Sequence, residues 1–125
     1  MGAPPLVHLD SLVFIYYLDS TDTRLHEASR ALINQVIEGE VSAITSQISV
    51  IETLSPSRYA QDLNRLESYS LFFHTTPHLT VYPVDWHVSL EAARLRRQFA
   101  PLRTPDAIQL ATALAHGAAR FITHD

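Results

Sequence analysis

Four short apolar runs alternate along this chain with longer segments in which apolar residues recur every three or four positions. A short apolar run bounded by polar or turn residues is typical of a buried strand, whereas recurrence at three and four positions is typical of one helix face. The strands that this pattern predicts are residues 6–9, 41–45, 79–84 and 120–123.

Capping residues and a glycine mark where several helices are expected to begin and end. Gly39 follows an apolar stripe, as the residue beyond a helix often does. Ser46 and Asp85 are cap-forming residues directly before such stripes, and Thr104 is expected to cap a helix whose first residue is Pro105. The expected helices are residues 11–18, 23–38, 47–54, 58–73, 86–99 and 107–116.

Strands that alternate with helices predict a mainly parallel sheet covered on both faces, which is a three-layer α/β/α architecture. The chain has 125 residues, of which 46% are hydrophobic, so we expect one domain over residues 1–125 with a substantial core. No apolar run has the roughly 20 residues that a membrane span requires. Residues 1–5 lack a basic segment leading into an apolar one, so no secretory signal is expected.

Composition excludes several kinds of chemistry. The chain has no Cys, which rules out disulfides and thiolate metal sites and suits a reducing cytoplasm. All nine basic residues are Arg, so a lysine nucleophile and a P-loop lysine are both excluded. The net charge of −4 argues against a general nucleic-acid coat protein, although an enzyme that holds a phosphodiester through a metal ion remains possible.

Four acidic residues occupy positions where parallel strands meet the loops and helices that follow them. Asp10 ends the first expected strand, Asp125 follows the last, and Asp106 begins the helix before that strand. Glu52 lies in the helix after the second strand. Ligands of open α/β sheets bind beyond the carboxyl ends of the strands, so these acids are expected at one edge of the sheet.

Each acid also has a purely structural explanation. Asp10 can cap the following helix, and Asp106 can gain ~0.3–1 kcal/mol from the dipole of its helix. Glu52 can be a solvated residue beside an apolar stripe, and Asp125 is the final residue of the sequence. The functional interpretation therefore depends on the four acids as a set.

The histidines and arginines give weaker signals. None of the seven His residues forms an HExxH motif or another evident zinc set, and no G-x-S-x-G elbow presents a serine nucleophile. His8 shares a strand face with Asp10 and is a candidate supporting residue behind the site. The densest basic stretch holds Arg94, Arg96, Arg97 and Arg103, and it is either a solvated helix face or a phosphate-contacting rim. Of these, Arg94, Arg97 and Arg103 are the candidates for substrate binding.

Four segments in series resemble the PIN-domain nucleases, and among them the VapC-type toxins of bacterial and archaeal toxin–antitoxin pairs. The segments lie in the family's order and spacing over nearly the whole chain. They are Leu9-Asp10-Ser11 before Val13-Phe14-Ile15-Tyr16, Thr45-Ser46 before Glu52, Thr104-Pro105-Asp106-Ala107 before Leu110-Ala111-Thr112-Ala113-Leu114, and Phe121-Ile122-Thr123-His124-Asp125.

The resemblance implies a doubly wound sheet with an acidic pocket at its carboxyl edge. By position, Asp10, Glu52 and Asp106 match the three core acids of the family, and Asp125 matches its fourth. Ser11 and Thr123 match hydroxyl positions that support the pocket. The implied activity is cleavage of RNA that leaves a 5′-phosphate and a 3′-hydroxyl. The implied partners are a small antitoxin and a second copy of the chain.

Clustered carboxylates repel one another, and a hard divalent cation removes that repulsion. Oxygen-only ligands favour Mg²⁺ or Mn²⁺ over Zn²⁺. We expect Asp10 and Asp106 to be direct ligands of such an ion, which would activate a water for attack on the phosphodiester. Glu52 and Asp125 are expected to hold water on the ion or a second ion.

Two other classes of function remain open from the sequence. One is another Mg²⁺-dependent phosphate-handling α/β protein, although a receiver-type domain would need a late Lys that this chain lacks. The other is a catalytically inactive PIN-like interaction module. The complete set of acids favours the nuclease over both.

Overall fold

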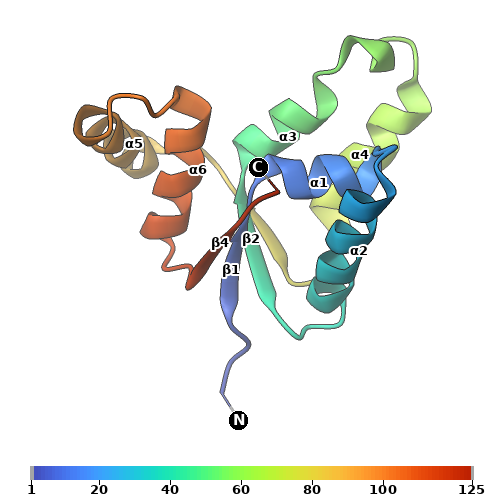
Figure 1. Cartoon of the computed structure of the whole chain (residues 1–125), viewed down its shortest axis with the longest axis horizontal. Helices are drawn as coiled ribbons and strands as arrows, with labels where there is room; N and C mark the ends of the chain where they lie inside the picture. Colours follow the sequence, from blue (N-terminus) through green and yellow to red (C-terminus); the bar gives the residue numbers. More distant parts are fainter. Residues whose placement is uncertain (1, 125) are drawn as a thin grey trace.

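The computed structural model describes residues 2–124, which form a four-stranded sheet between two groups of helices (Figure 1). All strand pairs are parallel, and the strand order is β3-β2-β1-β4. The strands are β1 (Leu6–Leu9), β2 (Ser42–Ser46), β3 (Leu79–Tyr82) and β4 (Arg120–Ile122). The expected three-layer α/β/α class is confirmed.

Six α-helices and one short 3₁₀ helix connect and cover the strands. They are α1 (Ser11–Leu18), α2 (Thr23–Ile37), α3 (Gln47–Leu54), η1 (Ser57–Tyr59), α4 (Leu63–Thr75), α5 (Trp86–Gln98) and α6 (Thr104–Ala115). The glycine expected after α2 has the positive φ that such a position requires, since Gly39 has φ 79°.

Successive strands are added on both sides of β1. The chain passes from β1 outward through β2 to β3, and then returns beyond β1 to add β4 on the other side. The strand order therefore reverses between β1 and β4, and connections leave in opposite directions from that point. A crevice forms at such a position in open α/β sheets.

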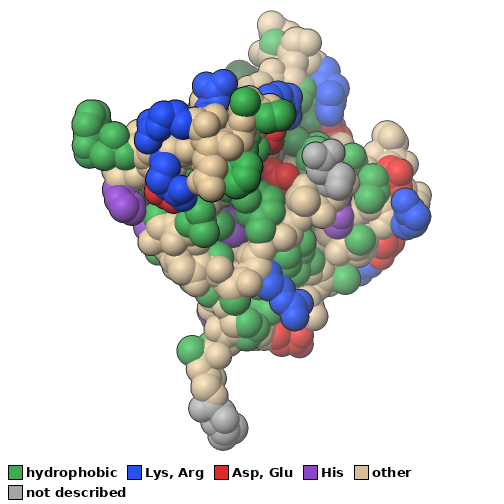
Figure 2. Space-filling model, turned by 60° about the vertical axis from the view of Figure 1, so that its left-hand side comes forward, with side chains coloured by type: hydrophobic (Ala, Val, Ile, Leu, Met, Phe, Trp, Pro, Cys, Tyr) green, Lys and Arg blue, Asp and Glu red, His purple; other side chains and the backbone are tan. Residues whose placement is uncertain are grey.

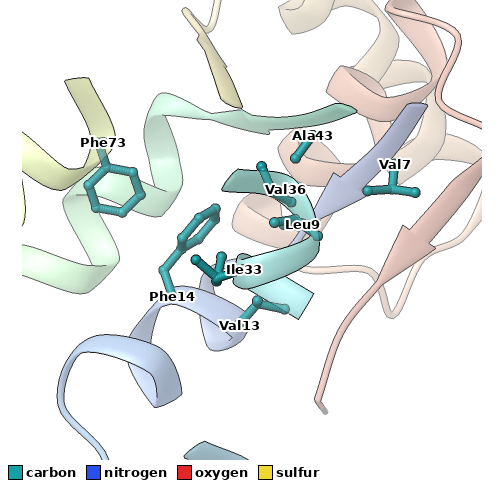
Figure 3. Close-up of a cluster of buried hydrophobic side chains, with 8 residues drawn as sticks. All are labelled: Val7, Leu9, Val13, Phe14, Ile33, Val36, Ala43 and Phe73. Atoms are coloured by element: carbon teal, nitrogen blue, oxygen red, sulfur yellow. The ribbon is translucent and has the colours of Figure 1, made fainter. Parts of the chain in front are cut away.

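One face of the sheet carries the larger core. Apolar residues of β1 and β2 meet residues of α1, α2 and α4 there (Figure 3). The cluster comprises Val7, Leu9, Val13, Phe14, Ile33, Val36, Ala43 and Phe73. Phe14 is fully buried, with its ring centroid 4.9 Å from that of Phe73, which ties α1 to α4 across this face.

The opposite face is covered by α5 and α6, which lie together on the left in Figure 1. Small residues of α6, Ala107 and Ala111, let α5 pack closely through Val88, Ala92 and Leu95. This packing fixes the start of α6, and with it Asp106, at the carboxyl edge of the sheet.

Several expected boundaries were wrong by a few residues. The helix predicted over residues 58–73 is divided into η1 and α4, because Asp62 accepts a hydrogen bond from the Arg65 N–H at 3.1 Å and starts a new helix. The strand predicted over residues 79–84 ends at Tyr82, before Pro83.

The start of α6 also differs from the prediction. Arg103 occupies the N-cap position, and no side chain caps the helix there. Thr104 is the first helical residue, and Pro105 follows within the first turn, where its missing N–H costs no hydrogen bond. Asp106 remains in the first turn as expected.

Over residues 2–124, no helix combines the length and the apolarity needed to cross a bilayer.

Candidate active site

A pocket of about 250 Å³ opens at the carboxyl ends of β1 and β4, where the strand order reverses. It is lined by Asp10, Leu102, Asp106, Gln109, Leu110, Phe121 and Thr123. Two of the acids predicted from the sequence, Asp10 and Asp106, therefore share one cavity although they lie far apart in the chain.

Asp10 is fixed by the end of β1 and by its neighbours. Its backbone N–H donates to the carbonyl of Ile122 at 3.0 Å, which ties the ends of β1 and β4 together. Its Oδ1 accepts from the Ser11 N–H at 2.6 Å, and its Oδ2 accepts from the Thr123 hydroxyl at 2.7 Å. Asp10 is thus both the N-cap of α1 and a wall of the pocket, so its structural and functional interpretations are compatible.

Ser11 links Glu52 to Asp10. The Ser11 hydroxyl is buried, donates to Oε1 of Glu52, and lies 3.2 Å from Oδ1 of Asp10. Glu52 comes from α3, on the far side of this hydroxyl, and does not line the pocket itself. Three of the predicted acids are therefore near one another, with Glu52 connected through a side chain rather than through the cavity.

Asp106 is partly exposed and pairs with an arginine. Its side chain is 47% exposed, and Oδ2 accepts from Nε of Arg103 at 3.1 Å. An exposed pair of this kind contributes only about 0–1 kcal/mol, so it does not prevent a cation from binding the carboxylate. Arg103, one of the predicted substrate-binding residues, is thereby placed at the mouth of the pocket.

The other two arginines predicted to bind substrate lie on α5, outside the pocket. Arg94 binds Glu91 at 2.6 Å and Gln98 at 2.9 Å, whereas Arg97 forms no ion pair with any residue from 2 to 124. Basic side chains gather on the face that α5 and α6 present in Figure 2, beside acidic and apolar side chains. This arrangement is compatible with either a rim for phosphate or a solvated face.

Gln109 is a component of the site that sequence reasoning missed. It lies on the sheet-facing side of α6, is only 2% exposed, and donates through Nε2 to the hydroxyls of Ser11 at 3.2 Å and Ser49 at 2.9 Å. The sequence did contain a signal for this residue, since Gln109 is a polar side chain within the apolar segment from Ala107 to Ala111. A buried amide requires hydrogen-bond partners, so such a position indicates polar side chains nearby.

His8 lies next to the site without joining it. The side chain is fully buried, its ring is stacked on Phe121 with centroids 4.8 Å apart, and neither nitrogen has a hydrogen-bond partner within residues 2–124. Burial lowers the pKa of His8 to about 4, against a smaller opposing effect of the Asp10 charge. The imidazole is consequently neutral at pH 7.

Asp125, the fourth predicted acid, lies outside the described residues, so its position stays a prediction. Within residues 2–124, no three His, Asp or Glu side chains are grouped so as to hold a metal ion. Mg²⁺ does not need three, because it commonly binds one or two carboxylates and fills its remaining positions with water and substrate oxygens. Asp10 and Asp106 therefore fit a hydrated divalent cation.

Fold and pocket together define a doubly wound α/β protein with an acidic site at its topological switch point. The sequence profile of the PIN domain family matches residues 7–125. The chain therefore belongs to the PIN domain family, as its sequence motifs suggested. No curated protein gives a significant sequence match.

Solved structures with the same fold include toxins and toxin–antitoxin complexes. VapC20 of Mycobacterium tuberculosis, a toxin that cleaves the sarcin–ricin loop, aligns with a TM-score of 0.76 and 15% identity over 95% of this chain and 89% of that one. VapBC2 of Rickettsia felis, bound to a DNA fragment of its promoter, aligns with a TM-score of 0.72 and 12% identity over 96% of this chain and 88% of that one. A toxin–antitoxin complex of Klebsiella pneumoniae aligns with a TM-score of 0.67 and 20% identity over 95% of this chain and 86% of that one. At these identities the likeness establishes the shared fold.

Proposed function

We propose that this chain is a Mg²⁺- or Mn²⁺-dependent endoribonuclease and the toxin of a VapC-type toxin–antitoxin pair. The observation that carries the proposal is the common pocket of Asp10 and Asp106 at the switch point of the sheet. Its carboxylates provide the hard oxygen ligands that these cations prefer. The fold shared with toxin structures supports RNA as the substrate.

The residues around the pocket have distinct tasks in this proposal. Asp10 and Asp106 hold the cation, which when bound supplies an activated water and neutralises charge on the leaving oxygen. Ser11 and Thr123 donate hydrogen bonds to the two oxygens of the Asp10 carboxylate, which would hold this carboxylate in one orientation for the ion. Glu52, oriented by Ser11, and Asp125 hold water at the edge of the site.

The substrate would be oriented by arginines at the rim. Arg103 is already at the mouth of the pocket through its bond to Asp106. Its guanidinium would be able to bind a phosphate oxygen if Asp106 held a cation, because the exposed ion pair with Asp106 is weak. Arg94 and Arg97 extend the basic surface along α5 and would contact the RNA backbone.

An antitoxin partner is supported by an apolar hollow beside the acidic pocket. This hollow has a volume of about 690 Å³ and shares Leu102 and Leu110 with the pocket. A peptide that inserts apolar side chains there can direct a cationic side chain onto Asp10 and Asp106, displacing the metal. We also propose that the chain forms a homodimer in the cytoplasm, as the VapC-type toxins that its sequence resembles do.

The proposal is tested by replacing the pocket acids without changing their shape. Asp10→Asn and Asp106→Asn should each lower Mn²⁺-dependent cleavage of total RNA at least 100-fold, because the cation loses a charged ligand. The matched control is Glu27→Gln on α2, whose carboxylate pairs with Arg30 on the surface and should not affect cleavage. The new ends should carry a 5′-phosphate and a 3′-hydroxyl, and full activity in either Asn variant would contradict the proposal.

The second candidate is an inactive PIN-like interaction module. It is favoured by the lack of a three-carboxylate cluster within residues 2–124. Thermal unfolding with and without Mn²⁺ separates the two functions, because only a metal-binding protein gains stability from the ion. A rise in melting temperature that Asp10→Asn abolishes supports the nuclease, and its absence in the unchanged protein supports the module.

A further inference from the structure

A series of hydrogen bonds lies beneath the pocket, and the chemistry of its members determines which atom donates in each bond. The Thr45 hydroxyl lies 2.7 Å from the carbonyl oxygen of Leu9, which can only accept, so Thr45 donates there. Ser49, 2.7 Å from Thr45, must therefore donate its own proton to the Thr45 oxygen. The oxygen of Ser49 is left to accept from the amide of Gln109, 2.9 Å away.

The second branch of this series has the same direction. Ser11 donates to the carboxylate of Glu52, so its oxygen accepts from Gln109 at 3.2 Å. Both hydrogens of the Gln109 amide are then in use, one toward α1 and one toward α3. The amide cannot be turned over, because its oxygen would face two hydroxyls whose protons are already donated elsewhere. Its orientation is thus fixed by the network.

This orientation leaves Oε1 of Gln109 without a hydrogen-bond partner among residues 2–124, although the atom is buried. An unsatisfied buried acceptor costs about 1–3 kcal/mol, so a donor is expected to reach it. The described residues that line the pocket with Gln109 supply none. Asp10 and Asp106 are acceptors, the Thr123 hydroxyl donates to Asp10, and the others present apolar side chains.

We propose that Gln109 is a positioning residue of the cation site and that its Oε1 accepts a hydrogen bond from the hydration shell of a divalent ion held by Asp10 and Asp106. The inference rests on the proposed metal dependence and extends it to a neutral residue. A hydrated cation has water hydrogens that need acceptors, and a carbonyl oxygen provides one without adding to the repulsion between the carboxylates. The same amide orients Ser11, and through it Glu52.

The test measures Mn²⁺ binding to the whole chain by calorimetry, without RNA. Gln109→Met keeps the length and burial of the side chain but removes the oxygen together with the two N–H donors to Ser11 and Ser49, so Mn²⁺ affinity should fall about 10- to 100-fold, the usual cost of losing an outer partner. Gln109→Glu retains an oxygen at the place of Oε1 but loses both N–H donors, so it separates the two roles of the side chain. Its Mn²⁺ affinity should stay close to that of the unchanged protein, whereas a loss equal to that of Gln109→Met would show that the amide acts only through Ser11 and Ser49. The control, Thr112→Val, removes a buried hydroxyl of α6 whose single partner within residues 2–124 is the Ile108 carbonyl, and it should not alter affinity.

The outcomes separate this inference from the proposed function. Unchanged Mn²⁺ affinity in Gln109→Met, together with its loss in Asp10→Asn, would overturn the role of Gln109 and leave the metal site standing. Absence of Mn²⁺ binding by the unchanged protein would overturn both. If Gln109→Met does not fold, Gln109→Glu decides the question, because a loss of Mn²⁺ affinity of about 10-fold or more with an oxygen still present contradicts a hydrogen bond from the hydration shell. Urea unfolding of the metal-free variants reports any loss of stability separately.

Discussion

His8 is an ionisable residue in a place that suits only its neutral form. Its ring lies flat against Phe121 with an interplanar angle of 6°, and the side chain has no exposure to solvent. Protonation would put a charge in the core with no hydrogen-bond acceptor, which explains the lowered pKa. The nearby charge of Asp10 offsets only part of this penalty.

The lowered pKa makes stability depend on pH. His8 takes up a proton near pH 6.5 in the unfolded chain but only near pH 4 in the folded one. The unfolded state therefore binds more protons between these values, and the free energy of unfolding falls as the pH drops through that window, by about 3 kcal/mol in total. His8→Leu should remove this part of the acid dependence in urea unfolding measured between pH 7 and pH 4.

The control for this measurement is His87→Gln, because His87 is an exposed histidine on α5. That variant should retain the pH dependence of the unchanged protein. Equal slopes for His8→Leu and His87→Gln would mean that His8 does not titrate abnormally.

At the scale of elements, one polar cluster ties the α3–α4 hairpin to the end of α1. Asp19, the C-cap of α1, accepts hydrogen bonds from the hydroxyl of Tyr59 and from Arg58 at 2.8 Å. Tyr69 of α4 donates to the Leu18 carbonyl at 2.8 Å. The hydrogen bonds from Tyr59 and Arg58 lower the pKa of Asp19, so their stabilising effect is present at neutral pH and disappears as the pH falls through that lowered value.

Removal of one hydroxyl should loosen this attachment. Tyr59 is almost fully buried, with the Arg58 guanidinium 4.8 Å above its ring. Tyr59→Phe keeps this packing and loses the hydrogen bond that the hydroxyl donates to Asp19 and the one that it accepts from Arg58 at 3.2 Å. We expect a loss of about 1 kcal/mol in the free energy of unfolding. Hydrogen exchange should increase in η1 and at the start of α4.

Tyr82→Phe is the matched control for this change, because the Tyr82 hydroxyl makes no hydrogen bond to any residue from 2 to 124. An equal loss in both variants would show that the hydrogen bond to Asp19 contributes nothing of its own.

The same cluster accompanies the division of the helix predicted over residues 58–73. Asp19 contacts Arg58 and Tyr59 of η1 and Arg65 at the start of α4, which are two separate elements.

At the scale of the whole molecule, charge is distributed unevenly. The net charge is −4, yet arginines gather on the face formed by α5 and α6, next to the acidic pocket (Figure 2). Phosphate contacts release counterions, so RNA binding at such a surface must weaken with salt. The uneven distribution, not the net charge, is then the relevant electrostatic property.

Replacement of the rim arginines should weaken this dependence. The triple variant Arg94→Gln, Arg97→Gln, Arg103→Gln should bind a fluorescent single-stranded RNA more weakly in metal-free buffer. The slope of log K against log salt should become shallower by as much as about 2, because each arginine that no longer neutralises a phosphate reduces the slope by about 0.7.

A variant with Arg24→Gln and Arg30→Gln, which removes two positive charges instead of three, controls for the loss of charge away from the rim, because both residues lie on α2, across the sheet from α5 and α6. It should keep the slope of the unchanged protein. Identical slopes for the triple and the control variant would identify the rim as a solvated face.

The sequence alone determined the order in which strands and helices follow one another along the chain. It also placed Asp10 and Asp106 at the edge where parallel strands end. Apolar periodicity and caps encode such information locally, so neighbouring residues suffice to predict it. The start of α4 was not predicted, because several polar residues before it can cap a helix. The apolar pattern does not show that Asp62 is the one that does.

Only the tertiary structure decided which residues meet. It brought Asp10 and Asp106 into one pocket, inserted Ser11 between Asp10 and Glu52, and placed the Gln109 amide beneath them. These contacts join α1, α3 and α6, whose relative positions follow from the strand order β3-β2-β1-β4. That order is a property of long-range pairing and is absent from local periodicity, which is why the network around Gln109 could not be derived from the sequence.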